Sequence, residues 1–145
     1  MNTQIATTIE QSERLVKCGI PADTADMSRG IHFHEKSHTL MARPYGTFPR
    51  ICKRDSVIPA WSLSRLLRLL PKTIKANKTT YKLNIDYPPI GQVAVRYNTE
   101  EDDLDSLFGL MGDDLFELIV LMVEKLTANG YRLDDCPCRE KGGRK

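Results

Sequence analysis

A stripe of leucines between two prolines is the clearest local pattern in the chain. Its members follow the spacing i, i+3, i+4 and i+7 of one helix face: Leu63, Leu66, Leu67 and Leu70. Ser62 is a residue type that caps helix N-termini, and Pro71 disfavours helical geometry at the residue before it. The pattern predicts a helix near residues 62–70. So short a helix is unstable alone, so its leucines must pack on a larger structure.

Trp61 is the only tryptophan, and it directly precedes this helix. With Ser62 as the cap, Trp61 and Leu66 occupy the two positions of a hydrophobic staple. We expect the helix to pack in the core. The alternative is that its apolar face docks in the groove of a partner.

Two further helices are predicted, near residues 8–18 and 113–129. Thr7 and Glu10 have the spacing of a capping box, and Gly19 suits the end of the first helix. The last helix has acidic residues at its start, a continuous apolar face and Gly130 at its end. The same helical spacing continues upstream through residues 104–111, but Gly109 and Gly112 oppose one unbroken helix.

Strand patterns are strongest over residues 80–97. Apolar and polar residues alternate from Tyr81 to Tyr87 and again from Val93 to Tyr97, on either side of a proline- and glycine-containing turn. This predicts an antiparallel hairpin. A lone hairpin is marginal, so we expect a further strand from residues 38–52. Short strands are also compatible with residues 31–33 and 39–42.

Together these elements predict one α+β domain over residues 5–133, with a small antiparallel sheet packed against the three helices. Residues 134–145 are polar and glycine-rich, which is typical of a disordered tail.

Hydrophobic residues make up 41% and charged residues 28%, as in ordinary globular proteins. No apolar run is long enough for a membrane span, and the N-terminus lacks the pattern of a signal peptide. We therefore expect a cytoplasmic location, no membrane association and reduced cysteines.

Charge is divided unevenly along the chain. Residues 1–97 hold 15 Lys and Arg against 7 Asp and Glu, whereas residues 98–135 hold 2 against 11. Either the two segments pair within the fold, or they form separate basic and acidic surfaces. A basic surface beside Tyr81 could bind nucleic acid, with these residues as candidates: Arg65, Arg68, Lys72, Lys75, Lys78 and Lys82.

Three histidines lie close together in sequence and are candidate metal ligands: His32, His34 and His38. Three imidazoles can hold zinc with an open position for water, although an exposed histidine loop explains the same pattern. Cys136 and Cys138 form one C-x-C pair, whereas structural zinc sites are typically built from paired C-x₂₋₄-C motifs. We therefore assign no cofactor.

Three stretches together resemble a family of small bacterial proteins that often occur among phage-like and mobile-element genes. They are Asp23–Met27 (DTADM), Ile58–Leu63 (IPAWSL) and the closing Asn129–Tyr131 (NGY). The resemblance covers about residues 7–133 and implies a small α+β domain of unassigned function, with no catalytic residues to carry over. The basic segment and the Cys136–Cys138 tail depart from the family pattern.

No phosphate-binding loop, dinucleotide-binding turn or nucleophile elbow is present in the sequence. The preferred hypothesis is therefore a non-enzymatic accessory or protein-interaction domain with a protein partner. Nucleic-acid binding through the basic segment is the first alternative. A metal-dependent enzyme at the three histidines is the second.

Overall fold

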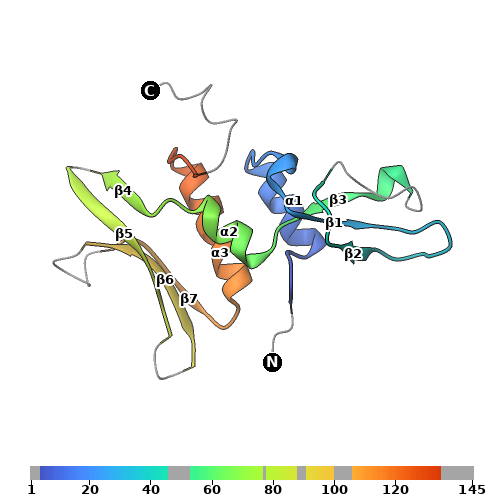
Figure 1. The fold of residues 1–145 in the computed structure, drawn as a ribbon. Helices are drawn as coiled ribbons and strands as arrows, with labels where there is room; N and C mark the ends of the chain where they lie inside the picture. Colours follow the sequence, from blue (N-terminus) through green and yellow to red (C-terminus); the bar gives the residue numbers. More distant parts are fainter. Residues whose placement is uncertain (1–3, 46–52, 77, 88–90, 100–105, 135–145) are drawn as a thin grey trace. The chain divides into compact units, whose positions relative to one another are not determined.

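The computed structural model describes residues 4–45, 53–76, 78–87, 91–99 and 106–134. Within these residues the chain forms three α-helices and two antiparallel sheets, one of three strands and one of four. The expected α+β class is confirmed. The elements gather into two compact units that divide between Leu69 and Leu70 (Figure 1). The expectation of a single domain over residues 5–133 stays a prediction, and residues 135–145 of the expected tail lie outside the described part.

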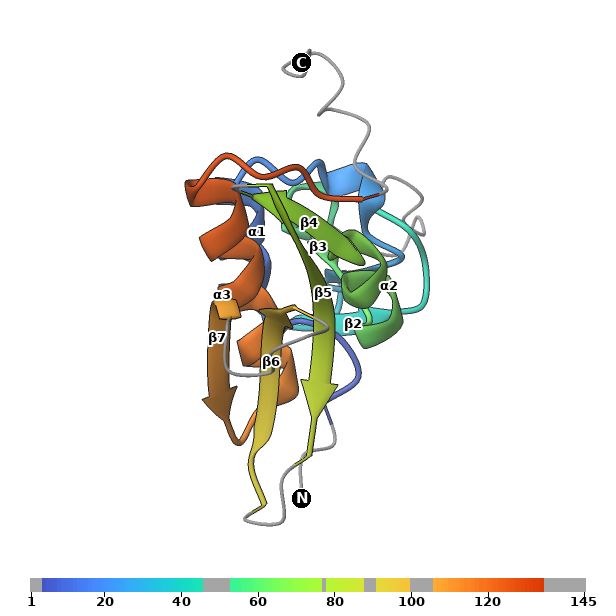
Figure 2. The ribbon, with the colours of Figure 1, turned by 90° about the vertical axis from the view of Figure 1, so that its left-hand side faces the viewer.

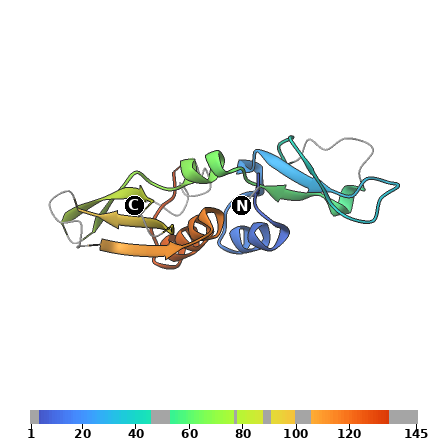
Figure 3. The same ribbon diagram turned by 90° about the horizontal axis from the view of Figure 1, so that it is seen from below.

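The first unit contains two helices and the three-stranded sheet. The helices are α1 (Ile9–Lys17) and α2 (Leu63–Leu69), and the strands are β1 (Met27–Gly30), β2 (Thr39–Met41) and β3 (Ile58–Ala60). The strand order is β2-β1-β3, and every pairing is antiparallel. The long connection between β1 and β2 is the cyan loop of Figure 3. Single-turn 3-10 helices cover Ala22–Thr24 and Arg54–Ser56.

Trp61 belongs to the first unit and is fully buried. Its indole Nε1 donates a hydrogen bond to Thr24 Oγ1 at 3.1 Å. Its backbone N–H donates to Thr7 Oγ1 at 3.0 Å, and its carbonyl accepts from the Thr7 N–H at 2.9 Å. A buried indole N–H needs such a partner, since leaving it unpaired costs about 1–3 kcal/mol. These contacts confirm Trp61 as a core residue and contradict its exposure in a partner groove.

The cap of α1 lies one residue further along the chain than the sequence suggested. Thr8 is the N-cap, and Gln11 closes the capping box by accepting from the Thr8 N–H. The expected pair of Thr7 and Glu10 is wrong. The Thr7 hydroxyl is occupied by Trp61 and by Ser12, which fixes Thr7 in the extended segment before the helix.

Helix α2 confirms the helix predicted near residues 62–70, although its buried face differs in part from the predicted leucine stripe. Ser62 caps it, because its Oγ accepts from the Arg65 N–H at 3.2 Å and its carbonyl accepts from the Leu66 N–H at 3.0 Å. The helix ends at Leu69, two residues before Pro71. Leu66, Leu69 and Leu70 are fully buried, whereas Leu63 and Leu67 of the predicted stripe are only half-buried. The residues just before the cap form strand β3, which the sequence analysis missed. Pro59 is tolerated there because β3 is an edge strand.

The second unit spans Leu70–Asp134 and contains the four-stranded sheet with one helix. The strands are β4 (Thr73–Ala76), β5 (Thr79–Asp86), β6 (Val93–Asn98) and β7 (Ser106–Gly112), in sequential order across the sheet. Figure 2 shows this antiparallel meander from its side. Helix α3 (Leu115–Ala128) packs against β6 and β7. The predicted hairpin is therefore confirmed as β5 and β6.

The partners of that hairpin differ from expectation. The added strands are β4 and β7, whereas the only strand in residues 38–52 that the structure describes, β2, belongs to the other sheet. Residues 106–112 form a strand, so the helical spacing seen in the sequence upstream of residue 113 does not correspond to a helix in these residues. Two glycines weaken a helix there, and pairing with β6 supplies the backbone hydrogen bonds instead.

Candidate binding surface on the four-stranded sheet

The strand register assigns each residue of this sheet to one of two faces. One face packs on α3: the Phe108 ring lies 5.8 Å from the Tyr131 ring, and Lys125 Nζ lies 5.8 Å from the centre of the Phe108 ring. Directly paired residues share a face, so the register places the following residues on the opposite face: Thr73, Lys75, Thr80, Lys82, Asn84, Asp86, Ala94, Arg96, Asn98, Gly109 and Met111. We call this second set the open face.

Most of the open face is accessible to solvent. Lys75, Lys82 and Gly109 are exposed, and the Met111 side chain is 56% exposed. An exposed methionine on a sheet face is still largely hydrated, so its apolar side chain can be buried by a binding partner. Ala94 is only 3% exposed and forms part of the floor of this surface between the longer side chains.

One ion pair links two strands of the open face. Arg96 Nη2 donates to Asp86 Oδ2 at 2.7 Å, with side-chain exposures of 29% and 43%. Asp86 pairs directly with Ala94 and Arg96 with Asn84, so the two charged residues are diagonal neighbours across β5 and β6. At this exposure the pair adds about 1 kcal/mol or less to stability, and its larger effect is to orient the guanidinium.

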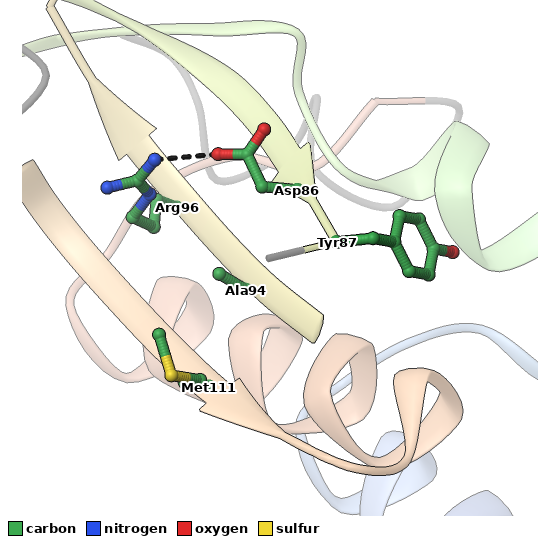
Figure 4. A pocket seen from close by; sticks show the side chains of 5 residues that line it. All are labelled: Asp86, Tyr87, Ala94, Arg96 and Met111. Carbon is green, nitrogen blue, oxygen red and sulfur yellow. Dashed lines mark hydrogen bonds and ion pairs between the residues drawn. The ribbon is translucent and has the colours of Figure 1, made fainter. Parts of the chain in front are cut away.

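The ion pair borders a hollow of about 370 Å³ lined by Asp86, Tyr87, Ala94, Arg96 and Met111. In Figure 4 Met111 lies on the neighbouring strand, and the Tyr87 ring points away from the ion pair. Tyr87 is 69% exposed. The hollow thus combines a charged wall, a flexible apolar side chain and an exposed aromatic ring.

The Nε of Arg96 is a further polar group beside the ion pair. It is buried and has no hydrogen-bond partner among the described residues. The side chain passes over Gly109, where an added Cβ would lie 3.6 Å from Arg96 Cγ. Arg96 is therefore held in place by packing and by one carboxylate, which leaves most of its donors for other acceptors.

The structure brings together only part of the basic set predicted from sequence. Lys75 and Lys82 lie on the open face, and Lys72 and Lys78 are exposed beside β4 and β5. Arg65 and Arg68 belong to α2 in the first unit. The Arg65 Nε donates to Thr24 O at 2.6 Å, so this guanidinium has a structural partner.

Tyr81, the expected stacking partner of the basic set, is 8% exposed. Its direct partner is Ile74, and the strand alternation places both on the face that packs on α3. Tyr81 is therefore a core residue, and its ring is not available for stacking with a nucleic-acid base.

The three histidines are not gathered around one point. His32 Nδ1 lies 3.3 Å from Glu35 Oε1, and His38 Nε2 lies 2.9 Å from Ser56 O. His34 is exposed in the same connection between β1 and β2. Across the described part of the chain, no three His, Cys, Asp or Glu side chains are placed to hold a metal. Cys18 is a free thiol, and Cys136 and Cys138 lie outside the described residues.

Sequence reasoning missed Arg96, Met111 and Tyr87. Arg96 occupies a polar position of an otherwise apolar strand, which was the available signal. No strand was predicted for the segment that contains Met111, so its position on a sheet face was missed. The exposure of Tyr87 follows from its position just beyond the end of β5, where strand alternation no longer applies.

Fold and surface define an α+β protein with an exposed sheet face. No family model matches the chain, and no curated protein or solved structure matches it. None of the helices in the described residues has the length and apolar character to cross a membrane.

Proposed function

We propose that this chain is a non-enzymatic interaction protein that binds a protein segment carrying acidic and apolar side chains on the open face. The single observation behind the proposal is the hollow, where Arg96, Tyr87 and Met111 come together. Tyr, Arg and Met are enriched in protein interfaces, and Tyr and Arg frequently provide the largest share of binding energy.

Charge supports an acidic partner. The described residues of the open face include three cations, Lys75, Lys82 and Arg96, against one anion, Asp86. Carboxylates of a bound segment would reach the lysines, while an apolar side chain would fill the hollow beside Met111. Peripheral lysines of this kind act mainly on the association rate and on its salt dependence.

The test begins with a photo-crosslinking amino acid at Met111 in cells that carry the gene. Val16, which is 47% exposed in the first unit, provides a matched control position. A partner crosslinked from position 111 only is then purified and titrated by calorimetry. M111D should weaken its binding at least about tenfold, whereas V16D should leave it unchanged. Equal crosslinking from both positions, or equal affinities of both variants, would contradict the proposal.

Nucleic-acid binding remains a second candidate, favoured by the exposure of four lysines on and beside the open face: Lys72, Lys75, Lys78 and Lys82. Phosphate contacts would give an affinity that falls steeply with salt. Replacing Lys75 and Lys82 by Gln should reduce the salt slope by about two if both neutralise phosphates. No binding to mixed single-stranded DNA or RNA at low salt would exclude this candidate.

A relationship to phage- or mobile-element-associated bacterial proteins and a cytoplasmic location remain proposals. Two of the three stretches behind the resemblance, DTADM and IPAWSL, are in direct contact through Asp26 and Ser62. This contact supports a shared structural role for the two motifs and carries no information on activity.

A further inference from the structure

The outer edge of β7 pairs with no other strand of the described residues. The sheet order places β7 last, and Figure 2 shows it at the margin of the sheet. Its only ladder in the described part of the chain is the one with β6. Alternate N–H and C=O groups of β7 therefore point outward, where they can pair with another extended segment.

The other sheet edges carry features that discourage pairing. Strand β4 has four residues and includes Lys75, β2 has three residues, and β3 contains Pro59. Strand β7 has none of these features, since its seven residues, SLFGLMG, include no charge and no proline. A long, uncharged edge is a template for strand addition.

The sequence of β7 is compatible with itself in antiparallel pairing. A two-fold axis through Gly109 would pair all seven residues of one copy with those of a second. Leu107 would face Met111, and Phe108 would face Leu110, so each cross-strand pair with large side chains is apolar. Gly109 would face its own counterpart, where the absence of side chains allows close approach. No other register centred on a residue of β7 pairs the whole strand.

We propose that two copies of this chain pair through β7 about a two-fold axis at Gly109, joining the four-stranded sheets into one continuous antiparallel sheet. Such an interface is isologous and closes at two subunits. It leaves the open face accessible on both copies and does not depend on the proposed function.

A disulfide test reports on both pairing and register. In a chain whose native cysteines are replaced by Ser, Gly109→Cys places two thiols directly opposite each other. Opposed Cα atoms in antiparallel strands lie about 4.5–5.5 Å apart, within the range for a disulfide. Met111→Cys is the matched control, because position 111 is also exposed. In this register its counterpart lies about 14 Å away, four residues along the strand.

Mild oxidation should convert G109C to a covalent dimer and leave M111C monomeric on a non-reducing gel. An added Cβ at Gly109 meets only ordinary contacts, so the variant should fold. Equal crosslinking of the two variants, or no crosslinking of G109C, would overturn the proposal.

Solution mass provides a second, independent measurement. By sedimentation or light scattering at about 100 µM, the native chain should have twice its 16.5 kDa monomer mass. G109E/M111E places four carboxylates along the interface between the two β7 strands and should raise the dissociation constant of the dimer about 100-fold or more. The neutral variant G109S/M111Q should remain dimeric. A native chain that is monomeric at this concentration, or a G109E/M111E variant that dimerises equally well, would refute β7 pairing.

Discussion

The carboxylate of Asp26 accepts two hydrogen bonds from Ser62, one from its backbone N–H at 2.9 Å and one from its hydroxyl at 2.5 Å. The same hydroxyl caps α2 by accepting from the Arg65 N–H. Asp26 therefore orients the cap, and its negative charge lies near the N-terminus of the helix. Residues 36 positions apart are joined in this way, which links the start of β1 to the start of α2.

Replacing Asp26 by Ala should lower the free energy of unfolding by about 1–2 kcal/mol, because the cap loses its charged acceptor. Asp23→Ala is the matched control, since Asp23 is exposed and close in sequence. The control should change stability by less than about 0.5 kcal/mol. Urea unfolding followed by tryptophan fluorescence measures both. Equal losses for the two variants would show that the Asp26–Ser62 contact contributes nothing specific.

Trp61→Ala should destabilise the protein by about 3–5 kcal/mol, the range for truncating a buried large aromatic residue. Trp61→Phe should cost less, because most of the apolar volume remains and only the bond to Thr24 is lost. Thermal unfolding followed by far-UV circular dichroism compares the two variants. An unchanged midpoint for W61A would be incompatible with the burial of the indole.

The sequence predicted those elements whose hydrophobic period is unambiguous. The leucine stripe of α2, the apolar face of α3 and the alternation of β5 and β6 each specify one type of element. The sequence left residues 106–112 unassigned, because their apolar spacing fits a helix while two glycines oppose one, and the chain forms an edge strand there. Residues 106–112 form a strand because they pair with β6. The local pattern of apolar residues carries no information about that pairing.

The candidate surface was predictable only in part. The exposure of Lys75 and Lys82 followed from their polar positions in the sequence. The hollow did not, because Asp86, Arg96 and Met111 are brought together by the register of three strands. The hairpin of β4 and β5 was also missed. Strand β4 has only four residues and one large apolar side chain, Ile74, so its alternation is too short to identify a strand from sequence.

Lys78 has a φ of 66°, a left-handed conformation that costs an ordinary L-residue about 1 kcal/mol or more. Lys78→Gly should therefore stabilise the protein by about 0.5–1 kcal/mol, after the extra freedom of glycine in the unfolded chain is counted. Lys75→Gly, within the neighbouring strand, should instead destabilise it by a similar amount. Chemical denaturation of both variants at the same salt concentration measures the two changes in unfolding free energy, which should have opposite signs. Destabilisation by K78G would contradict the strained turn.

Tyr97 should make stability sensitive to alkaline pH. Burial, assisted by the negative charge of Asp134, raises the pKa of the Tyr97 hydroxyl far above its ordinary value near 10. The hydroxyl donates to Pro71 O at 2.7 Å, a bond that only the protonated form can make. The stabilisation is fully present below about pH 10. Above that pH the unfolded chain releases this proton while the folded chain keeps it, so stability falls as pH rises.

Tyr97→Phe removes this dependence and the hydrogen bond together. At about pH 8 the variant should be less stable than the native chain by about 1 kcal/mol, because the Pro71 carbonyl loses its donor. Between about pH 10 and 11.5 the deficit should shrink, since only the native chain loses stability through Tyr97. Urea midpoints across this range give the comparison, and Tyr87→Phe, at an exposed position, should follow the native profile. A constant deficit for Y97F at every pH would show that the Tyr97 hydroxyl titrates alike in the folded and unfolded chains.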